Sequence, residues 1–451
     1  MGGLPSAHMQ VSMSGFLFYF VGFLLAFPAR AGPETEPEAR CPDYVARHAP
    51  LVWLHSEDSY KPSDLLTHIR HTTPVLDGQP IHDLPPLDLD NLEILNKYGE
   101  DVALASNDDP TTYPPWFHGE APDEDGRIHN ATPCVVILVE KSKRDMDAFY
   151  FYFYSFNEGP NITQVLEPLN RLVKGGKVAS GMHFGDHVGD WEHNMVRFRD
   201  GKPVGIYYSQ HDGGAGYKWN DPKITKTDGR PIVYSALGSH ANYVAPGNQL
   251  HNIVLVDYCD AGQKWDPILS AYFYRLDADS FTLTRIEPPG QSPPASPASN
   301  FTSFFYYTGR WGDIRWPDSD SRQETVPHFG LKRYESGPTG PRHKQLLRKG
   351  LKPEQRRRIG WKEWGVGVFM AWYPCCIRGW RKWVSLGTII VVLSGTVVGI
   401  VLGVRRYRRR KYQRLQAEDV ALDDWVLEDE ALLSSSDEDE DMGKKRNVKL
   451  R

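Results

Sequence analysis

The sequence predicts a mainly β protein, in which a β-sandwich domain with short helices precedes one C-terminal transmembrane helix. Three observations lead to this fold class. Runs of β-branched and aromatic residues recur between residues 134 and 256, loops rather than long helices separate them, and residues 384–404 form an apolar run without a charge. The chain has 451 residues, of which 12% are aromatic, so a large core can form beside terminal tails.

The predicted strands start at residue 134. Residues 134–140 (CVVILVE) and 147–155 (DAFYFYFYS) flank the charged sequence KSKRDM, which predicts two adjacent strands joined by a turn. The second run has no charged residue from Tyr150 to Tyr154, so we expect both of its faces to be buried. Short helices are expected after Ser63, acting as a cap, and over residues 164–173. Further strands are predicted at residues 193–198, 203–209, 231–237 and 253–256.

Composition divides the chain into five segments. They are a signal peptide at 1–31, a luminal β-sandwich domain at 41–333, a basic juxtamembrane stalk at 334–383, a transmembrane helix at 384–404 and a cytosolic tail at 405–451. The signal peptide is predicted from a short apolar core and the sequence Ala29-Arg30-Ala31, although no Lys or Arg precedes the core. Gly2 and Ser6 fit an alternative myristoylation pattern, which demands fewer matching residues.

The charges beside the apolar run predict the topology. Residues 405–414 (RRYRRRKYQR) follow it directly, and basic segments favour the cytosolic side. We therefore expect a single-pass type I membrane protein of the secretory, endosomal and vacuolar system. Its predicted glycan acceptors are Asn130, Asn161 and Asn300. The net charge of -5 argues against a nucleic-acid partner, and the three cysteines of the luminal part permit one disulfide.

A histidine and two carboxylates lie close together in residues 185–198 (GDHVGDWEHNMVRF). In an extended segment Asp190 and Glu192 share one face, and His187 precedes them after a glycine-flanked turn. Carboxylate oxygens favour hard divalent cations such as Ca²⁺ or Mg²⁺. The alternative is a solvated strand face with a histidine in the turn.

Six phrases of the sequence together resemble one family. They are APLVWLHSEDSYKPSD, YFYSFNEG, GDHVGDWEHNMVRF, YSALGSHANY, KWDPILSAYFY and GRWGD. In this order, over residues 44–313, they resemble the fungal vacuolar protein sorting-associated protein 62 family. The resemblance implies a role in delivering proteins to the vacuole and leaves the chemistry undefined.

The central motif also resembles, more remotely, the necrosis- and ethylene-inducing peptide-like proteins, which are secreted β-sandwich toxins. The resemblance implies a metal site at His187, Asp190 and Glu192, with Glu158 near the position of a further ligand. It also implies a glycan or glycolipid headgroup as the ligand, because those toxins bind sphingolipid headgroups. Gly189 departs from the toxin pattern, which has a second histidine at this position.

No folded structure is predicted for the tail, which instead carries two predicted sorting signals. Tyr412 and Leu415 form a tyrosine-based signal, while Glu428, Leu432 and Leu433 form an acidic dileucine signal. Both types dock as extended peptides on clathrin-adaptor-type sorting machinery.

Three hypotheses follow for the function. The leading one is a cation-binding luminal domain that recognises a polar ligand during sorting to the vacuole. The second is a metal-dependent hydrolase with Glu192 as the base, and the third is a cargo receptor without metal. Ser239 and His240 do not form the elbow motif of a nucleophilic serine, so no catalytic residue is predicted and an enzyme is not the preferred reading.

Overall fold

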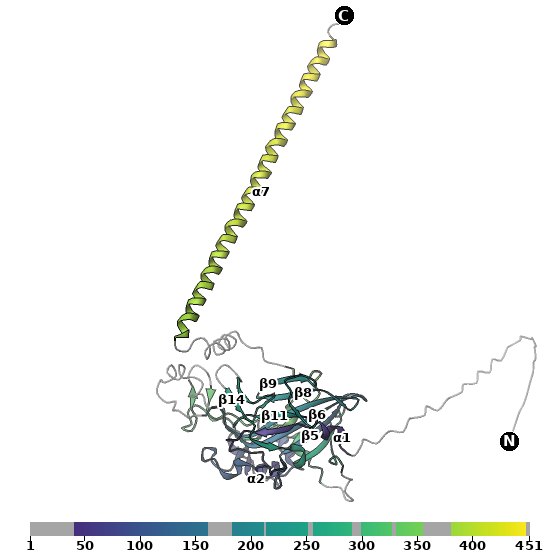
Figure 1. The fold of residues 1–451 in the computed structure, drawn as a ribbon, viewed down its shortest axis with the longest axis vertical. Helices are drawn as coiled ribbons and strands as arrows, with labels where there is room; N and C mark the ends of the chain where they lie inside the picture. Colours follow the sequence, from purple (N-terminus) through teal and green to yellow (C-terminus); the bar gives the residue numbers. More distant parts are fainter. Residues whose placement is uncertain are drawn as a thin grey trace, which may run out of the picture.

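The structure, a computed structural model, describes residues 40–160, 183–211, 213–250, 256–290, 299–326, 331–354 and 380–447. The expected signal peptide, Asn161, the helix at 164–173 and almost all of the tryptophan-rich segment before the apolar run lie outside these ranges. The described residues are mostly β, with short helices and one long C-terminal helix (Figure 1), which confirms the mainly β class.

The largest sheet carries seven strands within the described ranges. Its strand order is β17-β16-β5-β6-β7-β8-β9, and all neighbours are antiparallel except β16 and β5. The bounds are β5 Cys134–Glu140, β6 Asp145–Asn157, β7 His187–Arg199, β8 Lys202–Gln210, β9 Gly213–Lys218, β16 Ala271–Leu276 and β17 Leu283–Ile286.

Strand β6 explains why the two faces of this sheet differ. Side chains alternate along a strand, so the tyrosines at 150, 152 and 154 point to one face and the phenylalanines at 149, 151 and 153 to the other. All six are fully buried, which confirms the expected burial on both faces. The tyrosine face packs against a second sheet, and the phenylalanine face packs against helical segments.

The second sheet contributes Val52, Val233 and Trp265 to the cluster on the tyrosine face. It consists of β1 Leu51–Leu54, β10 Lys226–Thr227, β11 Arg230–Ser235, β12 Asn242–Tyr243 and β15 Gln263–Trp265. Its strands are short and β1 pairs with β11 in parallel. The large sheet and the second sheet therefore face each other. A regular β-sandwich remains a prediction.

Helical segments cover the phenylalanine face through Leu65, Leu95 and Phe304. They are α2 Leu65–Arg70, η1 Leu92–Tyr98 and α5 Ser303–Tyr306. The cap of α2 is Asp64, whose carboxylate accepts a hydrogen bond from Thr67 N at 2.8 Å, so the expected cap at Ser63 is wrong by one residue. Ser63 Oγ instead accepts a hydrogen bond from Ser155 N.

The remaining elements are short. They are α1 Asp43–Arg47, η2 Pro110–Thr112, η3 Pro115–His118, η4 Pro267–Ser270, η5 Pro341–His343, β2 Thr72–Leu76, β3 Gln79–Pro80, β4 Ala103–Ser106, β13 Gly247–Leu250, β14 Val256–Cys259, β18 Thr325–Val326 and β19 Leu331–Lys332. Cys134 and Cys259 are both free thiols in separate clusters, so the disulfide that the sequence permits does not join them.

The C-terminal helix α7 spans Arg381–Asn447 (Figure 1). Its first part, Trp383–Glu418, is long and apolar enough to cross a membrane, which agrees with the predicted span at 384–404. The helix then continues through the segment for which no fold was expected. Alanine, leucine and glutamate are frequent in this tail and favour helix.

The first part of the expected stalk belongs to the folded domain. Tyr334, Leu346 and Arg348 are buried, and Glu335 N donates to Asp186 O at 2.8 Å. The domain boundary that the sequence predicts at residue 333 therefore falls before residues that are buried in the domain.

Candidate functional site

The predicted site lies at the start of β7, six residues earlier than the strand was expected to begin. Asp190 pairs with Tyr154 of β6, and Glu192 pairs with Tyr152. Both carboxylates therefore point to the tyrosine face, as the two-residue spacing predicted. Further along β7, Val196 enters the core on this same face, so the polar end of the strand forms the site.

Asp190 forms a buried ion pair with His240. The Asp190 Oδ2 and His240 Nδ1 atoms lie 2.9 Å apart, and the side chain of His240 has no exposed surface. His240 Nε2 is 3.2 Å from the carbonyl oxygen of Tyr60, which can only accept. Both ring nitrogens therefore act as donors, as in an imidazolium. The ring also stacks on Tyr154, with centroids 3.7 Å apart.

The ion pair shifts the pKa values of Asp190 and His240 in the directions that favour their charged forms. Burial by itself raises the pKa of Asp190, but the hydrogen bond and charge of His240 outweigh it and lower the pKa. Burial lowers the pKa of His240, while Asp190 and the nearby Asp58 raise it above its usual value. Both shifts favour the charged forms of the two side chains.

Glu192 lies beside this ion pair, and neighbouring groups compensate its negative charge less well. Its Oε2 accepts a hydrogen bond from Ser209 Oγ, which in turn accepts one from His193 N at 2.8 Å. Burial, followed by the charge of Asp190, raises the pKa of Glu192 to about 7. A second buried negative charge next to Asp190 is thus poorly stabilised by the protein alone.

His187 presents a neutral ring nitrogen at the edge of the site. Its Nδ1 donates to the carbonyl oxygen of Gly189 at 2.7 Å, and Nε2 has no hydrogen-bond partner among the described residues. Burial lowers the pKa of His187, even though Asp190 opposes this effect. A neutral imidazole with Nδ1 protonated leaves the Nε2 lone pair available for a ligand or a cation.

Glu158 lies close enough to Asp58 and His240 to interact with their charges. Its carboxylate is 3.7 Å from His183 Nε2, and burial raises its pKa. Across the described part of the chain, no group of three or more His, Cys, Asp or Glu side chains is arranged to hold a metal ion. The structure thus brings Asp190, Glu192 and His187 into one neighbourhood and leaves Glu158 beside Asp58.

A second polar cluster adjoins Glu192 and was not assigned a role from the sequence. Asp257 Oδ2 accepts hydrogen bonds from His211 Nε2 at 2.8 Å and Tyr243 Oη at 2.6 Å, and Oδ1 accepts one from Ser239 Oγ at 2.8 Å. Burial lowers the pKa of His211, but Asp257 raises it above its usual value. Ser239 Oγ thus donates to a carboxylate and not to a histidine.

The departure at Gly189 has a steric cause. A Cβ atom placed on Gly189 would lie 1.9 Å from the carbonyl oxygen of Trp311, and the residue has a φ of +70°. A Cβ atom placed on Gly312, from the same GRWGD loop, would lie 1.9 Å from Val188 O. The loop therefore occupies the space that a side chain at position 189 would need.

Comparison with known proteins places the chain in a family. The family model of vacuolar protein sorting-associated protein 62 matches residues 151–258. The putative vacuolar protein sorting-associated protein TDA6 of Saccharomyces cerevisiae is 32% identical over 362 residues, covering 72% of this chain and 71% of the relative. Vacuolar protein sorting-associated protein 62 of the same yeast is 32% identical over 399 residues, covering 82% and 77%. The chain belongs to the vacuolar protein sorting-associated protein 62 family.

This membership confirms the predicted family and supports a role in vacuolar protein sorting. The matched segment 151–258 of the vacuolar protein sorting-associated protein 62 family contains His187, Asp190, Glu192 and His240. The site consequently lies inside the part of the chain that the family model describes.

Solved structures similar to this family member are necrosis- and ethylene-inducing proteins. The crystal structure of Necrosis and Ethylene inducing Protein 2 from the causal agent of cocoa's Witches Broom disease is 13% identical, covers 47% of this chain and 71% of that chain, and has a TM-score of 0.22. NLPPya in complex with glucosamine is 10% identical, covers 55% and 81%, and has a TM-score of 0.22. At such TM-scores no residue role is transferred.

Proposed function

We propose that this protein is a single-pass glycoprotein of the vacuolar system whose β domain binds a divalent cation at Asp190 and Glu192. Through this cation or beside it, the domain takes up a polar ligand such as a glycan or glycolipid headgroup. The observation that carries the proposal is the pair of buried carboxylates on β7, for which the pKa of Glu192 is raised to about 7. A cation between them would stabilise both negative charges.

The donor types suit a hard cation. Asp190 and Glu192 supply carboxylate oxygens, and His187 Nε2 supplies a neutral nitrogen nearby. Ca²⁺ and Mg²⁺ take six or more ligands and usually keep water or substrate oxygens among them. The few protein donors would leave positions for the hydroxyl groups of a glycan.

The anchor and the topology complete the proposal. The helix α7 contains the candidate span, and residues 405–414 follow it with a dense positive charge. Asn130 and Asn300 are both exposed and therefore accessible to glycosylation. These features favour a luminal β domain and a cytosolic tail.

The tail would route the protein by binding adaptor-type sorting machinery. Tyr412 and Leu415 are 65% and 48% exposed on α7, so both are accessible. Sorting signals of this kind bind as extended peptides, and α7 would therefore need to unwind locally. Glu428, Leu432 and Leu433 provide the second signal.

A metal-dependent hydrolase is the second candidate function. A general base works best with a pKa near the working pH, and the pKa of about 7 places Glu192 in that range. Replacement by Gln would then abolish turnover while the cation stays bound. If the domain binds no cation, the remaining hypothesis is a cargo receptor without metal.

Calorimetric titration tests the cation. Ca²⁺ and Mg²⁺ are added to the full chain in detergent micelles, in the wild type and in an Asp190→Asn, Glu192→Gln variant. The variant Glu100→Gln, Asp101→Asn is a matched control, because it removes two exposed carboxylates far along the chain from the site. Binding by the wild type and the control but not by the first variant supports the proposal, and equal binding by all three contradicts it.

A further inference from the structure

Residues 344–352, here named the strap, cross the phenylalanine face of the large sheet near β8 and β9. Leu351 packs where two glycines leave room for it. A Cβ atom on Gly205 would lie 2.7 Å from Leu351 Cδ1, and one on Gly216 would lie 3.2 Å from Leu351 Cβ. These two strand positions form the groove that receives the end of the strap.

Arg348 anchors the strap inside the domain. Only 2% of its surface is exposed, and its guanidinium lies 4.8 Å from the Phe149 ring centroid and 4.7 Å from that of Tyr207. It also donates to His193 Nε2 at 2.9 Å and to the carbonyl oxygen of Leu351 at 3.3 Å. Burial lowers the pKa of Arg348 to about 10, so it stays protonated at neutral pH.

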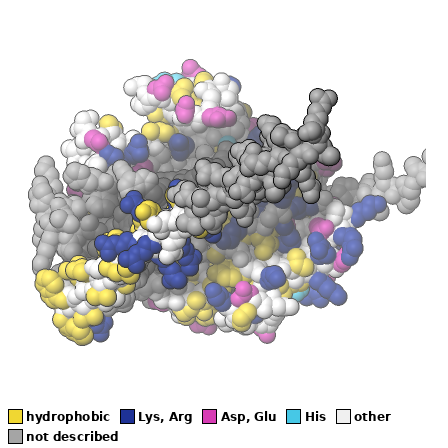
Figure 2. Space-filling view, turned by 90° about the horizontal axis from the view of Figure 1, so that it is seen from above, with side chains coloured by type: hydrophobic (Ala, Val, Ile, Leu, Met, Phe, Trp, Pro, Cys, Tyr) yellow, Lys and Arg dark blue, Asp and Glu magenta, His cyan; other side chains and the backbone are white. Residues whose placement is uncertain are grey.

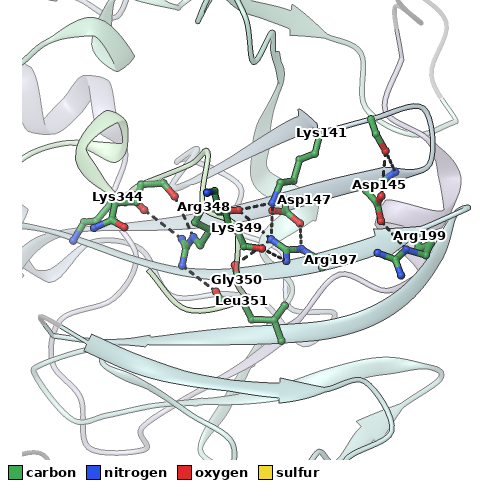
Figure 3. A network of polar contacts seen from close by, with 12 residues as sticks. Lys141, Asp145, Asp147, Arg197, Arg199, Lys344, Arg348, Lys349, Gly350 and Leu351 are labelled. Carbon is green, nitrogen blue, oxygen red and sulfur yellow. Dashed lines mark hydrogen bonds and ion pairs between the residues drawn. The ribbon is translucent and has the colours of Figure 1, made fainter. Parts of the chain in front are cut away.

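A second arginine holds the strap from the sheet side. Arg197 binds the fully buried Asp147 through two hydrogen bonds of 2.7 and 2.8 Å, and it donates to the carbonyl oxygens of Lys349 at 2.8 Å and Gly350 at 3.1 Å. Lys141 lies 3.3 Å from Asp147 and donates to Arg348 O. Figure 3 shows these side chains converging between the strap and the strands.

The strap lies within a surface of positive charge, here named the basic surface. Its members come from the strap and from neighbouring hairpins, which the pairs Arg144–Asp200 and Arg199–Asp145 hold together. Basic residues outnumber acidic ones within this set. Figure 2, which views the molecule from above, shows Lys and Arg side chains in dark blue at several places among acidic and apolar ones. The basic members are Lys141, Lys143, Arg144, Arg197, Arg199, Lys202, Lys218, Lys349 and Lys352, and the acidic ones are Glu140, Asp145, Asp147, Asp200 and Glu354.

We propose that the basic surface docks the β domain onto anionic headgroups of the bilayer leaflet that faces it, which is the luminal leaflet in the proposed topology. In the sequence the strap precedes the candidate membrane helix, and residues 353–380 separate the two. This segment spans at most roughly 100 Å when fully extended, so the surface is confined near the bilayer. Such tethering raises the effective concentration of lipid, and clustered Lys and Arg bind anionic leaflets.

The proposal does not depend on cation binding, because the basic surface and the carboxylate pair use different residues. Hydrogen exchange of the full chain in lipid nanodiscs tests it. The discs contain either phosphatidylcholine alone or equal parts of phosphatidylcholine and phosphatidylserine. We expect amides of the hairpin turns at 141–144 and 199–202 to exchange at least about threefold more slowly in the anionic discs, and high salt to remove the difference.

Two charge-reversal variants make the test specific. Lys349→Glu with Lys352→Glu should abolish the protection, since both side chains are exposed on the basic surface. Arg70→Glu with Lys97→Glu makes the same change of charge on α2 and η1 and should leave the protection intact. Equal exchange in both kinds of disc, or the same response in both variants, would overturn the proposal.

Discussion

The Asp190 carboxylate and the His240 imidazole form a buried ion pair, with Oδ2 and Nδ1 2.9 Å apart. The pair joins the start of β7 to the SALGSHANY loop, two segments that are 50 residues apart in the sequence. It stabilises one negative charge of the site and leaves Glu192 without an equivalent partner. That asymmetry is the basis of the proposed cation binding.

Replacing Asp190 by Asn should lower the free energy of unfolding by about 3 kcal/mol, because a buried imidazolium would keep only the more distant Asp58 as a counter-charge. The pair gives Asp190 a lowered pKa and His240 a raised one. The Asp190 contribution is present above about pH 3.9 and is lost as the pH falls through its lowered pKa. The His240 contribution is complete below about pH 6.5 and is lost as the pH rises through its raised pKa.

The difference between wild type and Asp190→Asn should therefore be largest at mildly acidic pH and shrink in alkaline solution. Urea denaturation of the full chain in micelles, followed by tryptophan fluorescence across this pH range, measures it. A difference that does not change with pH would show that the two side chains are not charged as a pair.

Replacing Gly189 by Ala should destabilise the domain by about 3 kcal/mol, since the new Cβ would meet the Trp311 carbonyl and the backbone has a positive φ. Gly185→Ala is the matched control. Its φ is +96°, but a Cβ there meets nothing within 4 Å, so only the backbone cost of about 1 kcal/mol applies. Thermal unfolding compares the two, and equal losses would contradict the close approach of the GRWGD loop.

Replacing Arg197 by Met should cost about 3 kcal/mol, because the fully buried Asp147 would keep only Lys141 as a cationic partner. Adding Asp147→Asn should recover part of this loss, since the unpaired charge is then removed. Lys349→Ala is the control and should change stability by less than about 0.5 kcal/mol. Additive losses in the double variant would mean that the two residues do not interact.

Glycosylation at Asn130 and Asn300 follows from their exposure and from the proposed topology. In the protein purified from a eukaryotic host, Asn130→Gln and Asn300→Gln should each increase electrophoretic mobility by one glycan. Endoglycosidase treatment should remove the difference from wild type. Unchanged mobility of both variants would place the β domain on the cytosolic side.

The sequence predicts the large sheet well because alternation and apolar runs report local structure. β5 begins and ends where expected, and β6 extends the expected run by two residues at each end. β7 begins six residues earlier than predicted. The sequence did not indicate this start because His187, Asp190 and Glu192 are polar, yet these residues continue the ladder with β6. Polar residues lack the apolar pattern from which a strand is predicted, so this part of β7 was not predicted as a strand.

The site was predictable only in part for a similar reason. Asp190 and Glu192 share a face because strand geometry requires it, and this needed no tertiary information. His240 belongs to a loop that is 50 residues away from Asp190 in the sequence. No local sequence spacing therefore predicts the contact between the two side chains. The strap was missed because Arg348 looks like one basic residue among many in the sequence, while the structure buries it against two rings.

Elemental analysis of the purified full chain after dialysis against trace Ca²⁺ and Mg²⁺ tests the central claim most directly. We predict one bound divalent cation per chain in the wild type and in the Glu100→Gln, Asp101→Asn control. We predict none in the Asp190→Asn, Glu192→Gln variant, provided that its circular dichroism shows a folded domain. A folded wild type without bound cation, or a variant that keeps it, would contradict cation binding by this carboxylate pair.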